Sequence, residues 1–269
     1  MKTLGKIVMG FVYLFLYAPL LVMFFFSFNR GRSTSVFAGF SLKWYRELFT
    51  SDKYLMECLK NSLQLAVISA VIATILGTIA AIGIYYLKNK YISGAIMTVN
   101  NIPMMNPDIV TGVALMLLFV FVGTLFHTTT KVNFWTLLIA HITFNIPYVL
   151  LNVLPKLRQT DPKLTEAAMD LGCTPMRAFM KVVLPQIRPG IAAGLLMAFT
   201  LSFDDFVISY YTSGTDFVTL PVYIYSLVKK TVTPDIYALY SIIFVAILLL
   251  LIVYNLITGN TEKKGIKTK

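Results

Sequence analysis

Six long apolar segments constrain the fold of this 269-residue chain more than any other feature of its sequence. A helix needs roughly 20 mostly apolar residues to cross the hydrocarbon core of a bilayer. Segments of about that length lie near residues 7–28, 62–87, 108–126, 135–154, 190–212 and 236–258. Only 13% of the residues are charged, whereas a soluble domain usually carries about a quarter. We therefore expect an all-α membrane protein with six transmembrane helices in a single domain over residues 1–269.

Two of these regions have features of their own. The first span follows Lys2 and Lys6 and shows no small-residue cleavage site, so we expect an uncleaved anchor rather than a removed signal peptide. A further apolar piece, residues 91–107, ends in an Asn-Pro pair that should interrupt a helix. Residues 91–126 are therefore expected to form a broken segment. At membrane depth such backbone is tolerated where protein or a water-filled cavity covers it.

The basic residues indicate how the chain is oriented. With the N-terminus inside, 14 Lys and Arg residues fall in the inner segments and 9 in the outer ones. Because short cytoplasmic loops are enriched in Lys and Arg, this distribution favours a cytoplasmic location for both termini. The net charge of +11 also suggests nucleic-acid binding, but the basic residues are scattered over loops and do not gather on one face. We therefore expect no nucleic-acid partner.

The loop after the fourth span, residues 155–188, contains signals for two short helices. Asp161 is suited to cap a first helix, and Gly172 can end it in a left-handed conformation. Thr174 is suited to cap a second helix, and Pro185 is expected to stop it. The sequence therefore predicts a helical hairpin that projects from the membrane on the cytoplasmic side.

The same loop carries a spaced pattern that resembles the EAA motif of ABC importer permeases. The matching positions are Glu166, Ala167, Ala168, Gly172, Leu184 and Pro185. Val182 stands where the family usually has isoleucine. In that family the loop docks into a cleft of a separate ATPase subunit, so the resemblance implies that these positions contact such a subunit. No GxxxxGK[ST] sequence occurs in the chain. We therefore expect no cofactor in this chain, with ATP and Mg bound by the partner ATPase.

Three aspartates are the acidic residues that fall within the expected spans: Asp108, Asp204 and Asp205. No lysine or arginine lies inside any span to neutralise them. A carboxylate at the centre of a membrane helix costs about 2.5–3.5 kcal/mol on insertion scales, so such residues normally face a cavity or pathway. Asp108 has an alternative role at the positive end of its helix dipole. The other two have the alternative of a hydrogen bond to a partner subunit.

A continuous helix over the fifth span would place polar side chains along one stripe. Its members are Ser202, Asp205, Ser209 and Thr212, at i, i+3, i+7 and i+10. Aromatic residues lie close by in the sequence, and ring faces attract ammonium groups: Phe203, Phe206, Tyr210 and Tyr211. Carboxylates without fixed cations, together with aromatic rings, favour a cationic passenger. Trp44 in the first outer loop belongs either to an entrance or to an interfacial aromatic belt.

Four segments resemble PotC-type permeases of spermidine/putrescine ABC importers: residues 104–110, 141–149, 200–207 and 220–229. The similarity covers essentially residues 7–258. It implies the type I ABC importer permease fold in a bacterial cytoplasmic membrane, and a heterodimer with a PotB-type permease. An ATPase dimer and an extracytoplasmic polyamine-binding protein are the other implied partners. By this resemblance, the substrate-path candidates are Trp44, Asp108, Ser202, Asp204 and Asp205.

Two other classes of transporter remain open at this point. An ABC permease for another small solute would use the aspartates structurally, and an ion-coupled secondary transporter would use Asp204 or Asp205 as a proton or sodium relay. The second class leaves the EAA loop unexplained. We expect no metal site and no catalytic residues, because His127 and His141 belong to different segments and have no ligand at suitable spacing. His141 is expected to be a helix-packing residue.

Overall fold

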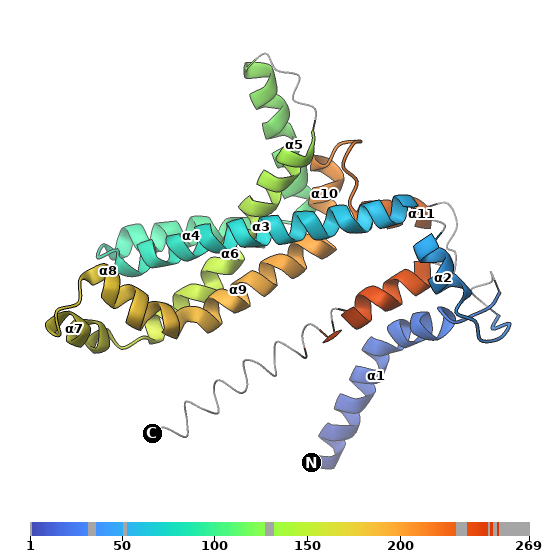
Figure 1. Cartoon of the computed structure of the whole chain (residues 1–269), viewed down its shortest axis with the longest axis horizontal. Helices are drawn as coiled ribbons and strands as arrows, with labels where there is room; N and C mark the ends of the chain where they lie inside the picture. Colours follow the sequence, from blue (N-terminus) through green and yellow to red (C-terminus); the bar gives the residue numbers. More distant parts are fainter. Residues whose placement is uncertain are drawn as a thin grey trace. The chain divides into compact units, whose positions relative to one another are not determined.

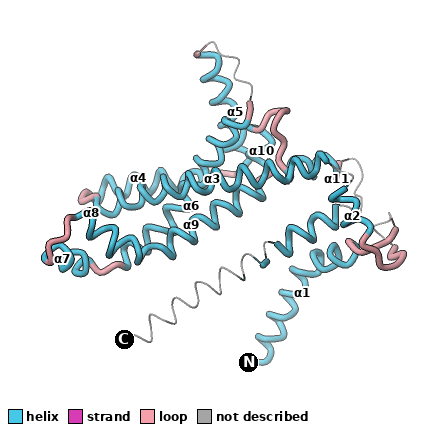
Figure 2. The backbone as a smooth tube through the Cα atoms, in the orientation of Figure 1, coloured by secondary structure: helices cyan, strands magenta, loops and turns pink. Residues whose placement is uncertain are grey.

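A computed structural model describes residues 2–31, 36–50, 53–126, 132–229, 236–246, 248–249 and 252. In these ranges the regular elements are helices, joined mostly by short loops, as Figure 2 shows. The described residues also contain an isolated antiparallel β-bridge between Asn29 and Phe40. The prediction of an all-α protein is therefore confirmed. His127 lies outside the described residues.

Five helices are long and apolar enough to cross a membrane: Val8–Phe26, Lys53–Tyr86, Asp108–Leu125, Phe134–Gln159 and Pro175–Asp204. They overlap the first five predicted spans, but the fifth runs over Pro175–Asp204, whereas the sequence predicts residues 190–212. For the sixth, the described residues contain a shorter apolar helix, Ile236–Ala246. Much of the remainder of the predicted span 236–258 lies outside the described residues. Five of the six predicted spans are therefore present as long helices, and the sixth stays a prediction.

The chain divides into two compact units. The first comprises residues 1–56 and 224–269, and the second comprises residues 57–223. The first unit contains α1 (Lys2–Phe26), α2 (Lys43–Thr50) and the helix Ile236–Ala246. The single domain expected over residues 1–269 stays a prediction.

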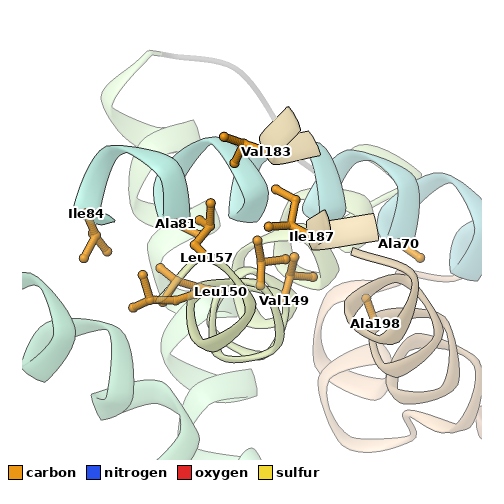
Figure 3. Packing of buried hydrophobic residues seen from close by; sticks show 11 residues of the cluster. Ala70, Ala81, Ile84, Val149, Leu150, Leu157, Val183, Ile187 and Ala198 are labelled. Carbon is orange, nitrogen blue, oxygen red and sulfur yellow. The ribbon is translucent and has the colours of Figure 1, made fainter. Parts of the chain in front are cut away.

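The core of the second unit is built on three long helices that run side by side (Figure 1). They are α3 (Lys53–Tyr86), α6 (Phe134–Gln159) and α9 (Leu184–Asp204). Figure 3 shows the buried apolar side chains that they share with the short π-helical turn η1 (Phe179–Val183). These side chains are Ala70, Ala81, Ile84, Val149, Leu150, Val153, Leu154, Leu157, Val183, Ile187 and Ala198. The helix α6 supplies the largest share, so it is the centre of this unit.

Glycines allow α3 and α9 to approach α6 closely. A Cβ atom added at Gly77 of α3 would lie 2.8 Å from Cβ of Val149, and one at Gly190 of α9 would lie 2.9 Å from the carbonyl oxygen of Asn152. Gly194, one turn after Gly190, also faces Val149. Membrane helices have little hydrophobic drive to associate with one another, so small residues that permit close van der Waals contact are the main device for packing them.

The predicted break in residues 91–126 is confirmed. The helix α4 (Lys90–Met105) ends at Asn106, and α5 begins at Asp108 after Pro107. The chain at Asn106 is extended, with φ −76° and ψ 142°, as expected for a residue that precedes proline. Pro103 lies inside α4 and does not end it. The direction of the chain therefore changes at the Asn-Pro pair (Figure 1).

The prediction that Pro185 stops the second hairpin helix is wrong. The helix α8 (Pro175–Ala178) continues through η1 into α9, which runs on past Pro185 to Asp204. A helical proline normally clashes with the carbonyl of the residue four positions earlier. The wider π turn immediately before α9, with the amide of Leu184 bonded to the carbonyl of Phe179, lets the helix continue. The second hairpin helix is thus the beginning of a transmembrane span.

A Gly77→Ala substitution is expected to destabilise the protein, whereas Gly83→Ala in the same helix is not. The new methyl group at position 77 meets a stiff β-branched side chain, and overpacking of this kind costs about 1–3 kcal/mol. At position 83 nothing lies within 4 Å, and alanine is the better helix former. Thermal unfolding of the detergent-solubilised protein measures both effects. Equal melting temperatures for the two variants would contradict the close packing of α3 on α6.

Candidate functional site

The helix α9 ends at Asp204, and a separate short helix, α10 (Val207–Thr212), follows. Asp205 is extended, with φ −66° and ψ 124°, and it interrupts the helical path. Its carboxylate accepts hydrogen bonds from the backbone amides of Ile208 at 3.2 Å and Ser209 at 2.7 Å. These amides have no partner within α10 itself because they lie in its first turn. Asp205 therefore stabilises the start of α10.

The expectation of one polar stripe along a continuous helix is wrong, because the helix is broken at Asp205 and Phe206. Aspartate competes for nearby backbone amides and so favours a helix start over a helix interior. The residues on either side of the break nevertheless turn toward α6. Ser202, Ser209 and Thr212 are all buried, so in this chain they belong to the interior.

A histidine of α6 contacts the start of α10. The His141 side chain is fully buried, and its Nε2 atom lies 3.1 Å from Oγ of Ser209 and 3.6 Å from Oδ2 of Asp205. The second distance is longer than an ordinary hydrogen bond. The first turn of α6 also reaches α10, because the Thr136 hydroxyl donates to the carbonyl of Thr212 at 3.0 Å. The short helix is thus held to α6 at both of its ends.

A second group of buried polar side chains joins three helices one turn earlier. The hydroxyl oxygen of Ser202 in α9 accepts hydrogen bonds from Asn145 in α6 at 2.6 Å and from Ser69 in α3 at 2.9 Å. All three side chains are buried. Ser202 therefore serves as a shared acceptor that fixes the end of α9 against its neighbours.

Asp204 and Asp108 differ from Asp205 in being exposed. In the described part of the chain, neither carboxylate has a hydrogen-bond or ion-pair partner. The helices that follow the two breaks, α5 (Asp108–Leu125) and α10, pack on each other. Gly112, one turn after Asp108, lies against the Tyr211 ring and the backbone of α10, where an added Cβ would be 3.1 Å from the ring. The break before α5 and the break before α10 therefore lie close together. Asp108 is the first residue of α5, and Asp205 lies just before α10.

Aromatic rings flank the break on both sides. Phe199 and Phe203 stack at 5.9 Å before it, and Phe206 and Tyr210 lie 5.6 Å apart after it. The Tyr210 ring also meets Tyr211 edge-on at 5.4 Å. Tyr210 is half exposed, and Asp204 lies between the two ring pairs in the chain. Carboxylates and ring faces both attract organic cations.

Trp44 lies in the first unit, whereas the other four substrate-path candidates lie in the second. Its side chain is 5% exposed, and its Nε1 atom donates a 2.6 Å hydrogen bond to the carbonyl of Asn29. The neighbouring Tyr45 hydroxyl lies 2.7 Å from the hydroxyl of Ser27. This placement differs from the expected entrance or belt, because the indole is closed into the interior of its unit.

The hairpin of residues 155–188 has the local structure that its sequence predicts up to Ala178. Asp161 accepts from the amide of Lys163 and caps α7 (Pro162–Asp170), and Thr174 caps α8. Gly172 has φ +88° and follows the end of α7. The amides of Gly172 and Cys173 bond back to Met169 and Ala168, the pattern of a Schellman motif.

The EAA-type positions of this hairpin are mostly accessible. No residue of α7 is buried, and Glu166, Ala167, Gly172 and Pro185 are exposed, while Ala168 and Leu184 are partly buried. Large apolar side chains on the same hairpin also face outward, with Leu171 87% and Met176 71% exposed. The hairpin lies at one end of the α3–α6–α9 bundle, and α10 lies toward the other (Figure 1). Exposed apolar side chains of this kind occur at surfaces that contact other proteins or membranes.

Comparison with known proteins identifies the family. Residues 73–265 match the family model described as "Binding-protein-dependent transport system inner membrane component". The chain belongs to this family. It is therefore the membrane permease of an ABC importer, a transport component rather than an enzyme.

Alignments with relatives extend over nearly the whole length of this permease. It is 36% identical over 255 residues to the spermidine/putrescine transport system permease protein PotC of Escherichia coli K12, covering 94% of this chain and 92% of the relative. It is 38% identical over 250 residues to PotC of Haemophilus influenzae, covering 92% and 93%. It is 37% identical over 261 residues to the putrescine permease PotI of Escherichia coli K12, covering 97% and 92%.

Solved structures show the same fold at low sequence identity. A bacterial ABC transporter involved in alginate import matches with a TM-score of 0.73 and 17% identity, covering 96% of this chain and 95% of that one. An amino acid ABC transporter matches with a TM-score of 0.56 and 21% identity, covering 81% and 96%. The type I importer permease fold expected from the sequence is therefore confirmed.

Sequence reasoning missed His141 and Asn145 as neighbours of the acidic break. The sequence did contain a signal, since the two residues are four positions apart and share one face of a helix in an apolar segment. Polar side chains on one face of a membrane helix need partners, and these are supplied by Ser209, Asp205 and Ser202. His141 is a packing residue as expected, but one with polar contacts.

An Asp205→Ala substitution is expected to lower the melting temperature of the purified protein, whereas Asp204→Ala is not. The first change leaves two amides of α10 without their acceptor, a loss of about 1–3 kcal/mol. The second removes a carboxylate that is exposed and has no partner in the described chain. Thermal unfolding of both variants in the same detergent makes the comparison. A larger loss for Asp204→Ala than for Asp205→Ala would contradict this division of roles.

Proposed function

We propose that this permease forms half of the translocation pathway for polyamines, with spermidine and putrescine as the substrate class. The observation that carries the proposal is the exposed, unpartnered carboxylate of Asp204, flanked by aromatic rings at the junction of two broken helices. Membrane transporters commonly bind substrate where helices are discontinuous. The relatives named as spermidine/putrescine permeases are 36–38% identical to this chain, which supports the same class.

The chemistry of the junction favours a flexible organic polycation. The carboxylate of Asp205 accepts hydrogen bonds from two amides, so Asp205 is a positioning residue that fixes the break. Asp204 and Asp108 keep their carboxylates free in the described chain and supply the negative charge that ammonium groups require. The stacked rings before the break and the Tyr210 ring after it offer apolar surface to the methylene segments and ring faces to the charges. An anionic solute would be repelled by the same carboxylates.

The permease is proposed to work with three kinds of partner. These are a PotB-type sister permease, an ATPase dimer that binds ATP and Mg, and an extracytoplasmic polyamine-binding protein. A solved neighbour of the same fold is described in complex with a substrate-bound periplasmic protein. Both termini are assigned to the cytoplasm of a bacterial cell, because this orientation puts 14 of the 23 basic residues on the inner side.

In this proposal, closure of the ATPase dimer on ATP pushes α7 and the start of the long helix Pro175–Asp204. The far end of that helix carries Asp204, so movement of the hairpin reaches the acidic junction directly. The binding protein releases its polyamine into the outward-facing pathway, and hydrolysis resets the permease. The coupling is mechanical, because this one helix, with its π turn at Phe179–Val183, joins the hairpin to the acidic junction.

The first test of function is uptake of labelled spermidine by the assembled complex. Asp204→Asn is expected to reduce ATP-dependent uptake at least about tenfold, since a hydrogen bond to a charged group is worth about 1.5–3 kcal/mol. Asp216→Asn is the matched control, because Asp216 is an exposed aspartate of the same unit that lies away from the break. Equal uptake by wild type and Asp204→Asn would contradict a role of Asp204 in the pathway. Absence of spermidine uptake by the wild-type complex would favour another small solute.

The second test concerns the hairpin. Glu166→Lys is expected to abolish uptake and substrate-stimulated ATP hydrolysis while leaving the permease inserted, because it reverses a charge on the proposed docking surface. Asp170→Lys makes the same charge change one turn later in α7, outside the EAA positions, and is expected to retain uptake. Deletion of residues 162–185 is unsuitable, because it would remove the beginning of a transmembrane helix. Unimpaired ATP-driven uptake by Glu166→Lys would show that α7 does not couple the two subunits in this way.

A further inference from the structure

A cavity of ≈ 450 Å³ lies at the end of the bundle where α3 turns into α4 and α6 ends. Its volume is within the range of small-molecule sites. The residues that line it come from these three helices and the turn between the first two: Ile84, Tyr85, Leu87, Lys90, Ser93, Gly94, Met97 and Arg158. Its walls are therefore largely apolar, with two cations from different helices.

The two cations have no counter-charge in the described chain. The ion pairs of the described residues are Lys43–Glu47 and His141–Asp205, so neither Lys90 nor Arg158 takes part in one. The described residues that line the cavity include no acidic side chain, and Asp161, three positions after Arg158, forms no ion pair with it. Two unpaired cations that share one hollow attract an anion from outside the chain.

The surroundings of the cavity indicate an anion with an apolar tail. The turn of residues 87–89 directly follows α3, a helix long and apolar enough to cross a membrane, so the cavity lies at the end of that helix, where a spanning helix leaves the hydrocarbon. The helix α4 has no buried residue, and apolar side chains such as Ile92 and Val99 are exposed along it. Basic hollows between membrane helices at this level suit phospholipid headgroups. A soluble anion would make no use of the exposed apolar length of α4.

We propose that this cavity binds the phosphate headgroup of an anionic phospholipid, with Lys90 and Arg158 as the phosphate ligands. The Ser93 hydroxyl adds a donor at the same wall, and the acyl chains lie along the apolar surface of α4. The lipid fills the hollow between the α3–α4 turn and the end of α6. It thereby stabilises the end of the bundle from which the α7 hairpin emerges.

The test measures lipid retention by native mass spectrometry of the full chain, alone and with the subunits that co-purify with it. The detergent-purified protein is titrated with phosphatidylglycerol or with phosphatidylcholine of the same acyl chains. The wild type is expected to retain phosphatidylglycerol preferentially. Lys90→Gln/Arg158→Gln is expected to bind it about thirty-fold more weakly, as for the loss of two basic residues at an anionic lipid surface.

Two matched variants separate a specific site from a general charge effect. Lys6→Gln/Arg188→Gln removes the same two charges at exposed positions that do not line the cavity, and it is expected to bind phosphatidylglycerol as the wild type does. Lys90→Arg/Arg158→Lys keeps both charges and is expected to retain most of the binding. Equal weakening by the two Gln pairs would overturn the proposal.

Further arms of the same experiment distinguish other occupants. Equal retention of phosphatidylcholine and phosphatidylglycerol would overturn the proposal, because the cations would then play no part. Displacement of the lipid by soluble glycerol 3-phosphate at equal concentration would assign the cavity to a free phosphate compound instead. If the chain alone bound phosphatidylglycerol in a charge-dependent way and the complex did not, the cavity would be assigned to an acidic segment of a partner subunit.

Discussion

The close packing of α3 and α9 on α6 is the interaction on which the rest of the second unit depends. Bilayer lipid is as apolar as a leucine side chain, so these helices gain little from hiding apolar surface from water. Their association rests on van der Waals contact, which Gly77, Gly190 and Gly194 make possible by removing the Cβ atoms that would hold the backbones apart. The site and the hairpin occupy opposite ends of this bundle (Figure 1).

The same environment explains the form of the acidic junction. Backbone amides within a membrane must find partners in the protein, so a helix can break there only if something satisfies its free groups. Asp205 does this for α10 with its own carboxylate, and His141 and Thr136 of α6 hold the short helix in place. One aspartate of the pair is therefore committed to structure. This commitment leaves its neighbour Asp204 exposed at a position that the break defines.

The continuous helix from Pro175 to Asp204 connects the hairpin with the acidic junction at the other end of the bundle. At 1.5 Å per residue, its 30 residues span roughly 45 Å, enough to cross the membrane and extend beyond it. A proline at position 185 would ordinarily interrupt such a rod. The π turn at Phe179–Val183 allows the helix to continue, so one helix joins the hairpin to the acidic junction.

The sequence by itself determined the helical class, the first five spans, the break at Asn106 and Pro107, and the caps of the hairpin. Each depends on local chemistry, namely the length of apolar runs, the geometry of proline and glycine, and side chains that reach their own backbone. The sequence also identified the three aspartates as unusual, because their charge is visible without a fold. Only the tertiary structure decided which of them is structural. That assignment depends on the helix break that lets Asp205 accept from the amides of Ile208 and Ser209, on backbone angles that no local pattern specifies, and on His141, which lies 64 positions before Asp205 in the chain and packs against it.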